Sequence, residues 1–190
     1  MHKEFVEQRI QESEEALNSI QDVDVLMERL LTEARRIANA DAGSIYEIND
    51  DSVQIKYSQN DTQQKKLAPG KKLPYQSFSF PLSENSMAGY SILKNEIINV
   101  KDAYKSGTTH PFKFNAGPDK KSGYKTTSML TIPLITYEGE KLGVFQIINA
   151  LDKDGNVIEF SKEIENYMKA FAFFANQTLL RAQRTRFQIM

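Results

Sequence analysis

Residues 128–149, SMLTIPLITYEGEKLGVFQIIN, decide the fold of this chain. Two apolar runs rich in β-branched residues flank the polar stretch 138–140, which favours a tight reversal. This pattern predicts a β-hairpin whose two strands are the best candidates for the centre of a sheet. Pro133 cannot donate a ladder hydrogen bond, so we expect it at an edge or at a bulge.

Further strands are predicted upstream of this hairpin. From Gly43 the apolar period is two, and turn residues at 49–52 separate the alternating segments 44–49 and 53–57, as in a second hairpin. A polar connection over 60–73, a short strand at 77–80 and a helix at 86–93 follow. The segment from Asp102 to Tyr124 is expected to be a long loop, and loops of that length in compact domains are usually functional.

Helices are predicted at both ends of the chain. Apolar residues recur at three- and four-residue steps from Lys3 to Asn39, and a break at 18–22, with Asp22 as N-cap, divides this stretch into two helices. A last helix begins after the cap Ser161 and runs to Met190. Its four-three spacing is typical of a coiled-coil seam, which needs a partner helix: Ile164, Met168, Phe171, Ala175, Thr178, Ala182, Thr185 and Ile189. Because this helix lacks a stop signal, we expect it to continue in a longer protein.

Composition narrows the possible functions of the chain. It has 190 residues with 24 Lys+Arg against 25 Asp+Glu, a net charge of −1 that gives no electrostatic reason to expect nucleic acid or membrane as partner. With no cysteine, thiolate chemistry, disulfides and covalent thioether cofactors are excluded. Two histidines cannot form a multi-histidine metal site, and no metal ligand set is expected. No membrane span or signal peptide is evident, so the expected location is cytoplasmic.

Five motifs, in this order and spacing, together resemble a known family. They are Ala40-Asp41-Ala42-Gly43-Ser44-Ile45-Tyr46, Met87-Ala88-Gly89-Tyr90, Ile98-Asn99-Val100-Lys101-Asp102-Ala103-Tyr104, residues 122–130 (SGYKTTSML) and residues 143–149 (GVFQIIN). Over residues 22–181 they look like a GAF domain, most similar to the cyclic-nucleotide type of phosphodiesterases, cyclases and bacterial signalling proteins. The resemblance implies an α+β fold: an antiparallel sheet of about six strands, terminal helices on one face and a small-molecule pocket on the other.

The resemblance also implies a set of ligand-binding residues. A serine on the first strand, backbone at the start of the Ala-Gly helix and hydroxyls around the Gly-Tyr turn would hold a purine and a phosphate, while aromatic rings could stack on the base; helix-start N–H groups and hydroxyls bind anions without a cation. The set is Ser44, Met87, Ala88, Tyr90, Asp102, Phe114, Asn115, Ser122, Tyr124 and Thr126. Taken one at a time, each also has an ordinary structural interpretation as a turn, packing or core residue.

The chain departs from the nucleotide-binding pattern at two places. Asn149, Phe160 and Glu165 match a motif in which a lysine and an aspartate form a pair, but here those two positions are Ala150 and Ile164. Replacing both partners of a buried ion pair by apolar groups can be neutral, so the fold should be retained, whereas support for cyclic AMP or GMP is weaker. An aromatic-acid pair at the end of the second strand is replaced by polar residues near Ser58 and Gln59.

The sequence therefore predicts a regulatory domain with no catalytic residues of its own. We expect residues 1–21 to form a signalling and dimerisation helix, 22–181 the GAF domain, and 182–190 the start of a helix to an absent output domain, such as an HD-GYP phosphodiesterase or a cyclase. The expected partners are a small ligand, a cyclic nucleotide or a similar molecule, and a second copy bound through the terminal helices. Three alternatives remain. The first is a structural domain that binds no ligand, and the second is an enzyme related to methionine sulfoxide reductases, which use cysteines. The third is a bilin or haem sensor.

Overall fold

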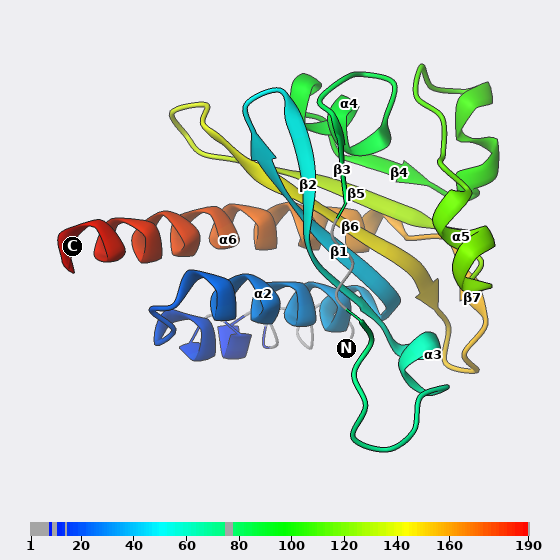
Figure 1. Ribbon diagram of the computed structural model, residues 1–190, viewed down its shortest axis with the longest axis horizontal. Helices are drawn as coiled ribbons and strands as arrows, with labels where there is room; N and C mark the ends of the chain where they lie inside the picture. Colours follow the sequence, from blue (N-terminus) through cyan, green and yellow to red (C-terminus); the bar gives the residue numbers. More distant parts are fainter. Residues whose placement is uncertain (1–7, 9–10, 14, 75–77, 190) are drawn as a thin grey trace.

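An antiparallel sheet separates two long helices on one face from short helices and loops on the other (Figure 1). The computed structural model describes residues 8, 11–13, 15–74 and 78–189, with side chains as far as Ala182. Six strands lie in the order β3-β2-β1-β6-β5-β4, and a short β7 pairs with β6. This is the α+β architecture expected from the sequence.

Both predicted hairpins are present in the sheet. The strands are β1 (Ala40–Asn49), β2 (Ser52–Asn60), β3 (Ser79–Pro81), β4 (Ile98–Val100), β5 (Met129–Ile135), β6 (Lys141–Leu151) and β7 (Val157–Ile158). Pro133 lies in β5 beyond the residues that pair with β4, which end at Thr131, so β5 is a local edge there. The expectation for this proline is therefore confirmed, while Ser77 of the predicted third strand lies outside the described residues.

The helices follow the predicted capping signals. They are α2 (Val23–Ala38), α3 (Asp61–Gln64), α4 (Met87–Lys94), α5 (Gly117–Ser122) and α6 (Lys162–Ile189), with a 3-10 helix η1 (Ala103–Thr108) and helical residues at 11–13 and 15–18. Asp22 accepts a hydrogen bond from the N–H of Val25 at 2.9 Å, and Ser161 accepts one from Ile164 at 3.2 Å. The segment 102–124, expected as a loop, instead contains η1 and α5.

The main core lies between the sheet and the pair α2 and α6, which run side by side (Figure 1). Several seam residues of α6 are buried in this core: Met168, Phe171, Ala175 and Ala182. Their partner helix is α2 of the same chain, so the four-three spacing is satisfied without a second copy. The side chains of Thr185 and Ile189 lie outside the described residues. The residues that the structure describes contain no helix with the length and apolar character needed to span a membrane.

On the opposite face, α4 packs against the sheet, with Ala88 and Ile92 in a cluster that includes Tyr46 and Val144. This close packing explains two motif glycines. A Cβ on Gly89 would overlap the carbonyl oxygen of Ser83, and one on Gly143 would overlap that of Tyr46. Both glycines therefore serve the approach of backbone segments, which positions α4 and β6 around the predicted site.

Candidate ligand-binding site

A row of three polar side chains crosses the centre of the sheet on the face covered by α4. Ser44 on β1 pairs with Gln146 on β6, which pairs with Thr131 on β5. The chain neighbours Ile45, Phe145 and Ile132 belong to the core with α2 and α6, so alternation directs the polar row to the other face.

All three polar residues of this row are buried, with relative exposures of 8%, 7% and 0% for Ser44, Gln146 and Thr131. Gln146 Nε2 donates a long hydrogen bond of 3.4 Å to Thr131 Oγ1, and the Ser44 hydroxyl is hydrogen-bonded to the side chain of Tyr46, two residues along β1. Gln146 was not among the predicted ligand residues. The signal that could have found it is a glutamine inside the apolar run 144–148 of a central strand.

The start of α4 lies on the same face. Ser86 caps the helix by accepting a hydrogen bond from the N–H of Gly89 at 3.0 Å, while the N–H groups of Met87 and Ala88 in the first turn have no partner within the helix. The ring of Tyr90 lies 5.3 Å from that of Phe112. Met87 and Tyr90 thus contribute mainly apolar contacts, in a cluster with Phe112 and Met129.

A buried carboxylate holds Thr126. Asp119 on α5, 7% exposed, accepts hydrogen bonds from the Thr126 N–H at 2.7 Å, from the Thr126 hydroxyl at 2.9 Å and from the Tyr104 hydroxyl at 2.9 Å. The hydrogen bond to Asp119 raises the pKa of Tyr104 above its ordinary value. The sequence predicted Thr126 as a ligand residue but not Asp119, because a single aspartate in a loop usually indicates a solvent-exposed residue.

A second polar network holds Tyr124. Its hydroxyl donates to Asp41 Oδ2 at 2.8 Å and accepts from Asn149 Nδ2 at 2.8 Å. Burial, and then the bond to Asp41, raise the pKa of this phenol. Asn149 also donates to the Lys125 carbonyl and accepts from the Thr127 N–H at 2.7 Å. The motif asparagine therefore ties the segment after α5 to the end of β6.

The other predicted residues lie in local turns or ring contacts. Asp102 caps η1 and pairs with Lys105 at 3.2 Å, and the ring of Phe114 lies 5.0 Å from that of Tyr104. Asn115 accepts from the N–H of Gly117, and Ser122 accepts from the N–H of Tyr124. Because Asn115 and Ser122 are exposed, the structure does not bring them to the buried polar row.

The expected departures from the nucleotide-binding pattern are visible in the packing. Ala150 is buried in the main core and Ile164 packs against it, so apolar contact replaces the ion pair and the fold is retained. Glu165, the matching acidic residue, accepts a hydrogen bond from Asn99 at 3.2 Å. At the end of β2, Ser58 is exposed, and Gln59 hydrogen-bonds Arg35 of α2.

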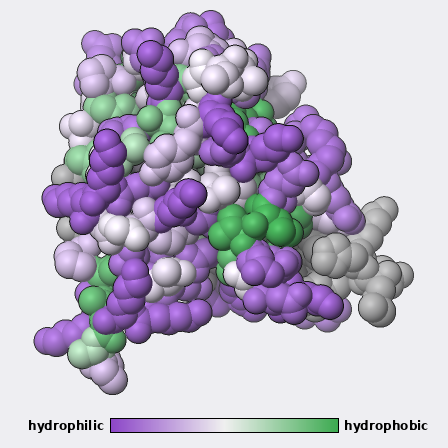
Figure 2. All heavy atoms as spheres, turned by 90° about the vertical axis from the view of Figure 1, so that its right-hand side faces the viewer, coloured by the Kyte–Doolittle hydropathy of each residue, from purple (hydrophilic) through white to green (hydrophobic). Residues whose placement is uncertain are grey.

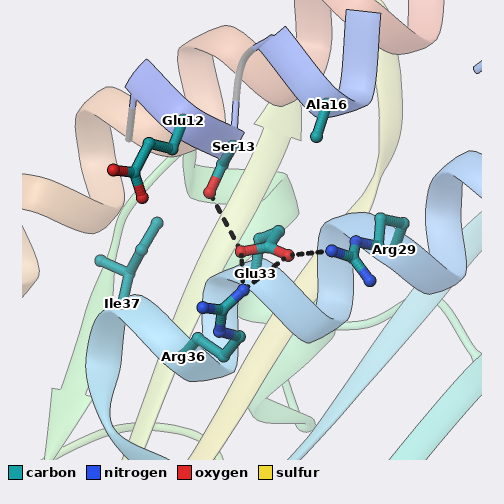
Figure 3. A pocket seen from close by; sticks show the side chains of 7 residues that line it. All are labelled: Glu12, Ser13, Ala16, Arg29, Glu33, Arg36 and Ile37. Carbon is teal, nitrogen blue, oxygen red and sulfur yellow. Dashed lines mark hydrogen bonds and ion pairs between the residues drawn. The ribbon is translucent and has the colours of Figure 1, made fainter. Parts of the chain in front are cut away.

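A separate hollow of about 70 Å³ lies between the N-terminal helical residues and α2 (Figure 3). It is lined by Glu12, Ser13, Ala16, Arg29, Glu33, Arg36 and Ile37. The buried carboxylate of Glu33 accepts a hydrogen bond from Ser13 at 3.0 Å and pairs with Arg29 at 3.0 Å and Arg36 at 3.1 Å. These contacts dock the N-terminal helical segment on α2, so the hollow is better explained as a helix contact than as a ligand site.

The comparisons with known proteins agree with this architecture. The sequence model of the GAF domain family matches residues 22–179. The "cGMP-specific 3',5'-cyclic phosphodiesterase" of Drosophila pseudoobscura pseudoobscura is 29% identical over 167 residues, covering 85% of this chain and 14% of that protein. That of Drosophila melanogaster is 34% identical over 97 residues, covering 51% and 8%. The chain thus spans only a small part of these curated relatives.

Solved structures show the same fold at low sequence identity. The GAF domain of a phosphoenolpyruvate-protein phosphotransferase from Coxiella burnetii superposes with a TM-score of 0.68 at 18% identity, covering 95% of each chain. The free methionine-R-sulfoxide reductase of Neisseria meningitidis superposes with a TM-score of 0.70 at 13% identity, covering 95% of this chain and 91% of that one. At such identities the likeness concerns the fold alone, and the present chain contains no cysteine.

Proposed function

Because the chain belongs to the GAF domain family of regulatory and sensor domains, we propose that it binds a small ligand, a cyclic nucleotide or a similar molecule, in the site under α4. The conformational change caused by ligand binding would pass through the terminal helices to an output domain. Our candidates for this output domain are an HD-GYP phosphodiesterase and a cyclase. In this proposal the domain itself performs no catalysis.

The buried row Ser44–Gln146–Thr131 is the observation that carries the proposal. Burying polar groups costs free energy, and this row places three polar side chains from paired strands at the centre of the sheet, where Gln146 donates to Thr131 over a long 3.4 Å and Ser44 shares a hydrogen bond with Tyr46. A domain that only packed against a partner would gain stability from apolar residues at these positions. A ligand with donors and acceptors gives the row a purpose.

The ligand's two ends would use different groups. A base would meet Ser44 and Gln146, and a phosphate would meet the N–H groups of Met87 and Ala88 at the start of α4. Thr126 would take part only after its hydroxyl turns away from Asp119, so binding and movement of α5 would be coupled.

A route to α6 begins next to Gln146. Its neighbour Phe145 points to the other face, where its ring lies 6.3 Å from that of Phe171 on α6. A shift of β6 on ligand binding would therefore reach the helix that leads toward residues 182–190.

The test is thermal unfolding of the purified chain with cGMP and with cAMP. Ligand at 100 times its dissociation constant adds about 2.7 kcal/mol to stability. Gln146→Met should abolish this stabilisation while the chain remains folded, and Gln177→Met, at an exposed position on α6, should preserve it. An unchanged unfolding temperature with both nucleotides would contradict the proposal.

A structural domain that only dimerises is the second candidate. It is favoured by the hydroxyls of Tyr124 and Thr126, which are already hydrogen-bonded within the chain. Phe173, 65% exposed on the outer side of α6, would be at the centre of its helix interface. Sedimentation that shows a dimer, lost in Phe173→Glu, together with no response to nucleotides, would favour this candidate.

A further inference from the structure

The loop that follows α3 concentrates positive charge. Residues 65–73, KKLAPGKKL, contain four lysines and no acidic residue, so this loop carries +4 while the remainder of the chain carries −5. The lysines flank an apolar centre as two pairs: Lys65, Lys66, Lys71 and Lys72. The net charge of −1 for the whole chain, which gives no reason to expect an anionic partner, averages this loop with an acidic remainder.

Two local features give the loop its shape. The first is a Pro-Gly turn over 68–71, in which Gly70 has a φ of 79° and the N–H of Lys71 donates to the carbonyl three residues earlier at 3.0 Å. The second is Gln64, the last residue of α3. Its side chain donates to the carbonyl of Lys71 at 2.6 Å and accepts from the N–H of Leu73 at 3.2 Å. The end of the loop is thereby held beside its start, so both lysine pairs belong to one closed loop.

The loop stands apart from the body of the domain. It extends below the sheet and the long helices in Figure 1 and forms the protrusion at the lower left of Figure 2, where hydrophobic residues lie among hydrophilic ones. All four lysines are exposed, as are Ala68 and Pro69, and a Cβ on Gly70 would meet no atom within 4 Å. Leu67 and Leu73 are partly exposed. The apolar tip and its lysines are therefore accessible to a partner.

The charge of the loop is not neutralised by ion pairs. Asp61, four residues before Lys65, pairs with Arg35 of α2 at 2.8 Å, and the sequence has no further acidic residue until Glu84. Within the described part of the chain, none of the four loop lysines forms an ion pair. The loop therefore presents four unpaired cations around an apolar tip.

An anionic lipid bilayer fits both features of this loop. Lysines near such a bilayer are attracted to its headgroups, while apolar residues enter the boundary between headgroups and acyl chains. Single-stranded nucleic acid fits less well, because its binding sites stack bases on aromatic rings and residues 61–73 contain none. We infer that the loop 65–73 is a membrane-contact site that docks this domain on an anionic lipid surface. The inference goes beyond the proposed function and does not depend on the ligand under α4.

Co-sedimentation of the purified chain with vesicles tests the docking. The chain should bind vesicles of phosphatidylcholine mixed with phosphatidylserine, and it should not bind phosphatidylcholine alone. Binding should be lost as the salt rises from about 0.1 M to about 1 M, over which the Debye length falls from about 10 Å to about 3 Å. Lys71→Gln/Lys72→Gln should weaken binding about thirtyfold, because each lysine near an anionic surface contributes to the attraction.

Lys141→Gln/Lys169→Gln is the matched control for the charge change. Both lysines are exposed, and they lie on β6 and α6, outside the loop. This double variant removes the same charge and should bind the vesicles as the parent does.

A tryptophan placed in the loop reports whether the apolar tip enters the bilayer, because the chain has no tryptophan of its own. In Ala68→Trp, fluorescence emission should shift to shorter wavelength on vesicles that contain phosphatidylserine, since the indole ring would enter the interfacial region. Tyr137→Trp, at a position that is 95% exposed between β5 and β6, should show no shift.

Four results would overturn the inference. They are binding that does not require phosphatidylserine, equal weakening by the two double variants, an unchanged emission spectrum in Ala68→Trp, and lysine-dependent binding of a single-stranded oligonucleotide that is tighter than binding of the vesicles. The last result would assign the loop to nucleic acid. None of them concerns stabilisation by cGMP or cAMP, so the proposed function is tested separately.

Discussion

Asp119 holds Thr126 through two hydrogen bonds, from the backbone N–H at 2.7 Å and from the hydroxyl at 2.9 Å. Asp119 is 7% exposed, and its carboxylate also accepts a hydrogen bond from the Tyr104 hydroxyl. Hydrogen bonds to a charged group contribute more than neutral ones, so this pair fixes α5 against the segment that enters β5.

Thr126→Val removes one of three donors to a buried carboxylate, which should destabilise the chain by about 1.5–3 kcal/mol in urea unfolding. The sheet should remain folded, and any nucleotide-induced stabilisation should be lost. Thr127→Val is the control, because its hydroxyl has no hydrogen bond among the described residues. Equal stability of the two variants would show that the bond to Asp119 contributes nothing.

Asn149→Ala should lower the free energy of unfolding far more than Asn95→Ala. Both asparagines have a positive φ, 57° and 54°, so alanine introduces similar backbone strain at each. The Asn149 side chain forms three additional hydrogen bonds, to Tyr124, Lys125 and Thr127. At about 1 kcal/mol each, the difference in the free energy of unfolding should be about 3 kcal/mol. Denaturant unfolding of the two variants measures this difference. Near-equal losses of stability would show that the side-chain hydrogen bonds of Asn149 do not hold the segment after α5 against β6.

Glu33→Gln should loosen the N-terminal helical segment from α2. The substitution removes the negative charge that pairs with Arg29 and Arg36, and the Ser13 hydroxyl, which donates to this carboxylate, would then donate to a weaker acceptor. The free energy of unfolding should fall by about 1–3 kcal/mol. Amide hydrogen exchange should increase in residues 11–13 and 15–18 more than in the strands. Glu28→Gln, at an exposed position of the same helix, should leave exchange unchanged; protection equal to the parent in Glu33→Gln would contradict the docking role.

Alkaline pH should destabilise the chain through Tyr46. Burial raises the pKa of this phenol from 10.0 to about 12. Because the pKa of Tyr46 is higher in the folded than in the unfolded chain, its contribution to the free energy of unfolding is complete below pH 10 and is lost as the pH rises toward 12. A pKa difference of two units corresponds to about 2.7 kcal/mol. Unfolding free energies of Tyr46→Phe should fall less steeply over this range. The exposed Tyr137→Phe should follow the parent, and identical slopes in all three proteins would rule out Tyr46 as the cause.

Local patterns were sufficient for most elements of the fold. Alternation in 128–149 predicted the central hairpin, and Asp22 and Ser161 were recognisable as caps because their short side chains suit free N–H groups. The candidate site was predicted less completely. Thr126 was recognised as a hydroxyl near a turn, but its partner Asp119, seven residues earlier, was not. Gln146 was not predicted, because it lies within the apolar run of a central strand.

The sequence by itself determined the order of helices and strands, because period, capping and turn chemistry depend on residues close along the chain. Only the tertiary structure decided which partners they meet. The seam of α6 packs on α2 and the sheet of the same chain, and the three polar residues of the buried row come from strands paired across the sheet. The physical reason is that burial and hydrogen bonding depend on distance in space, which spacing along one segment does not contain.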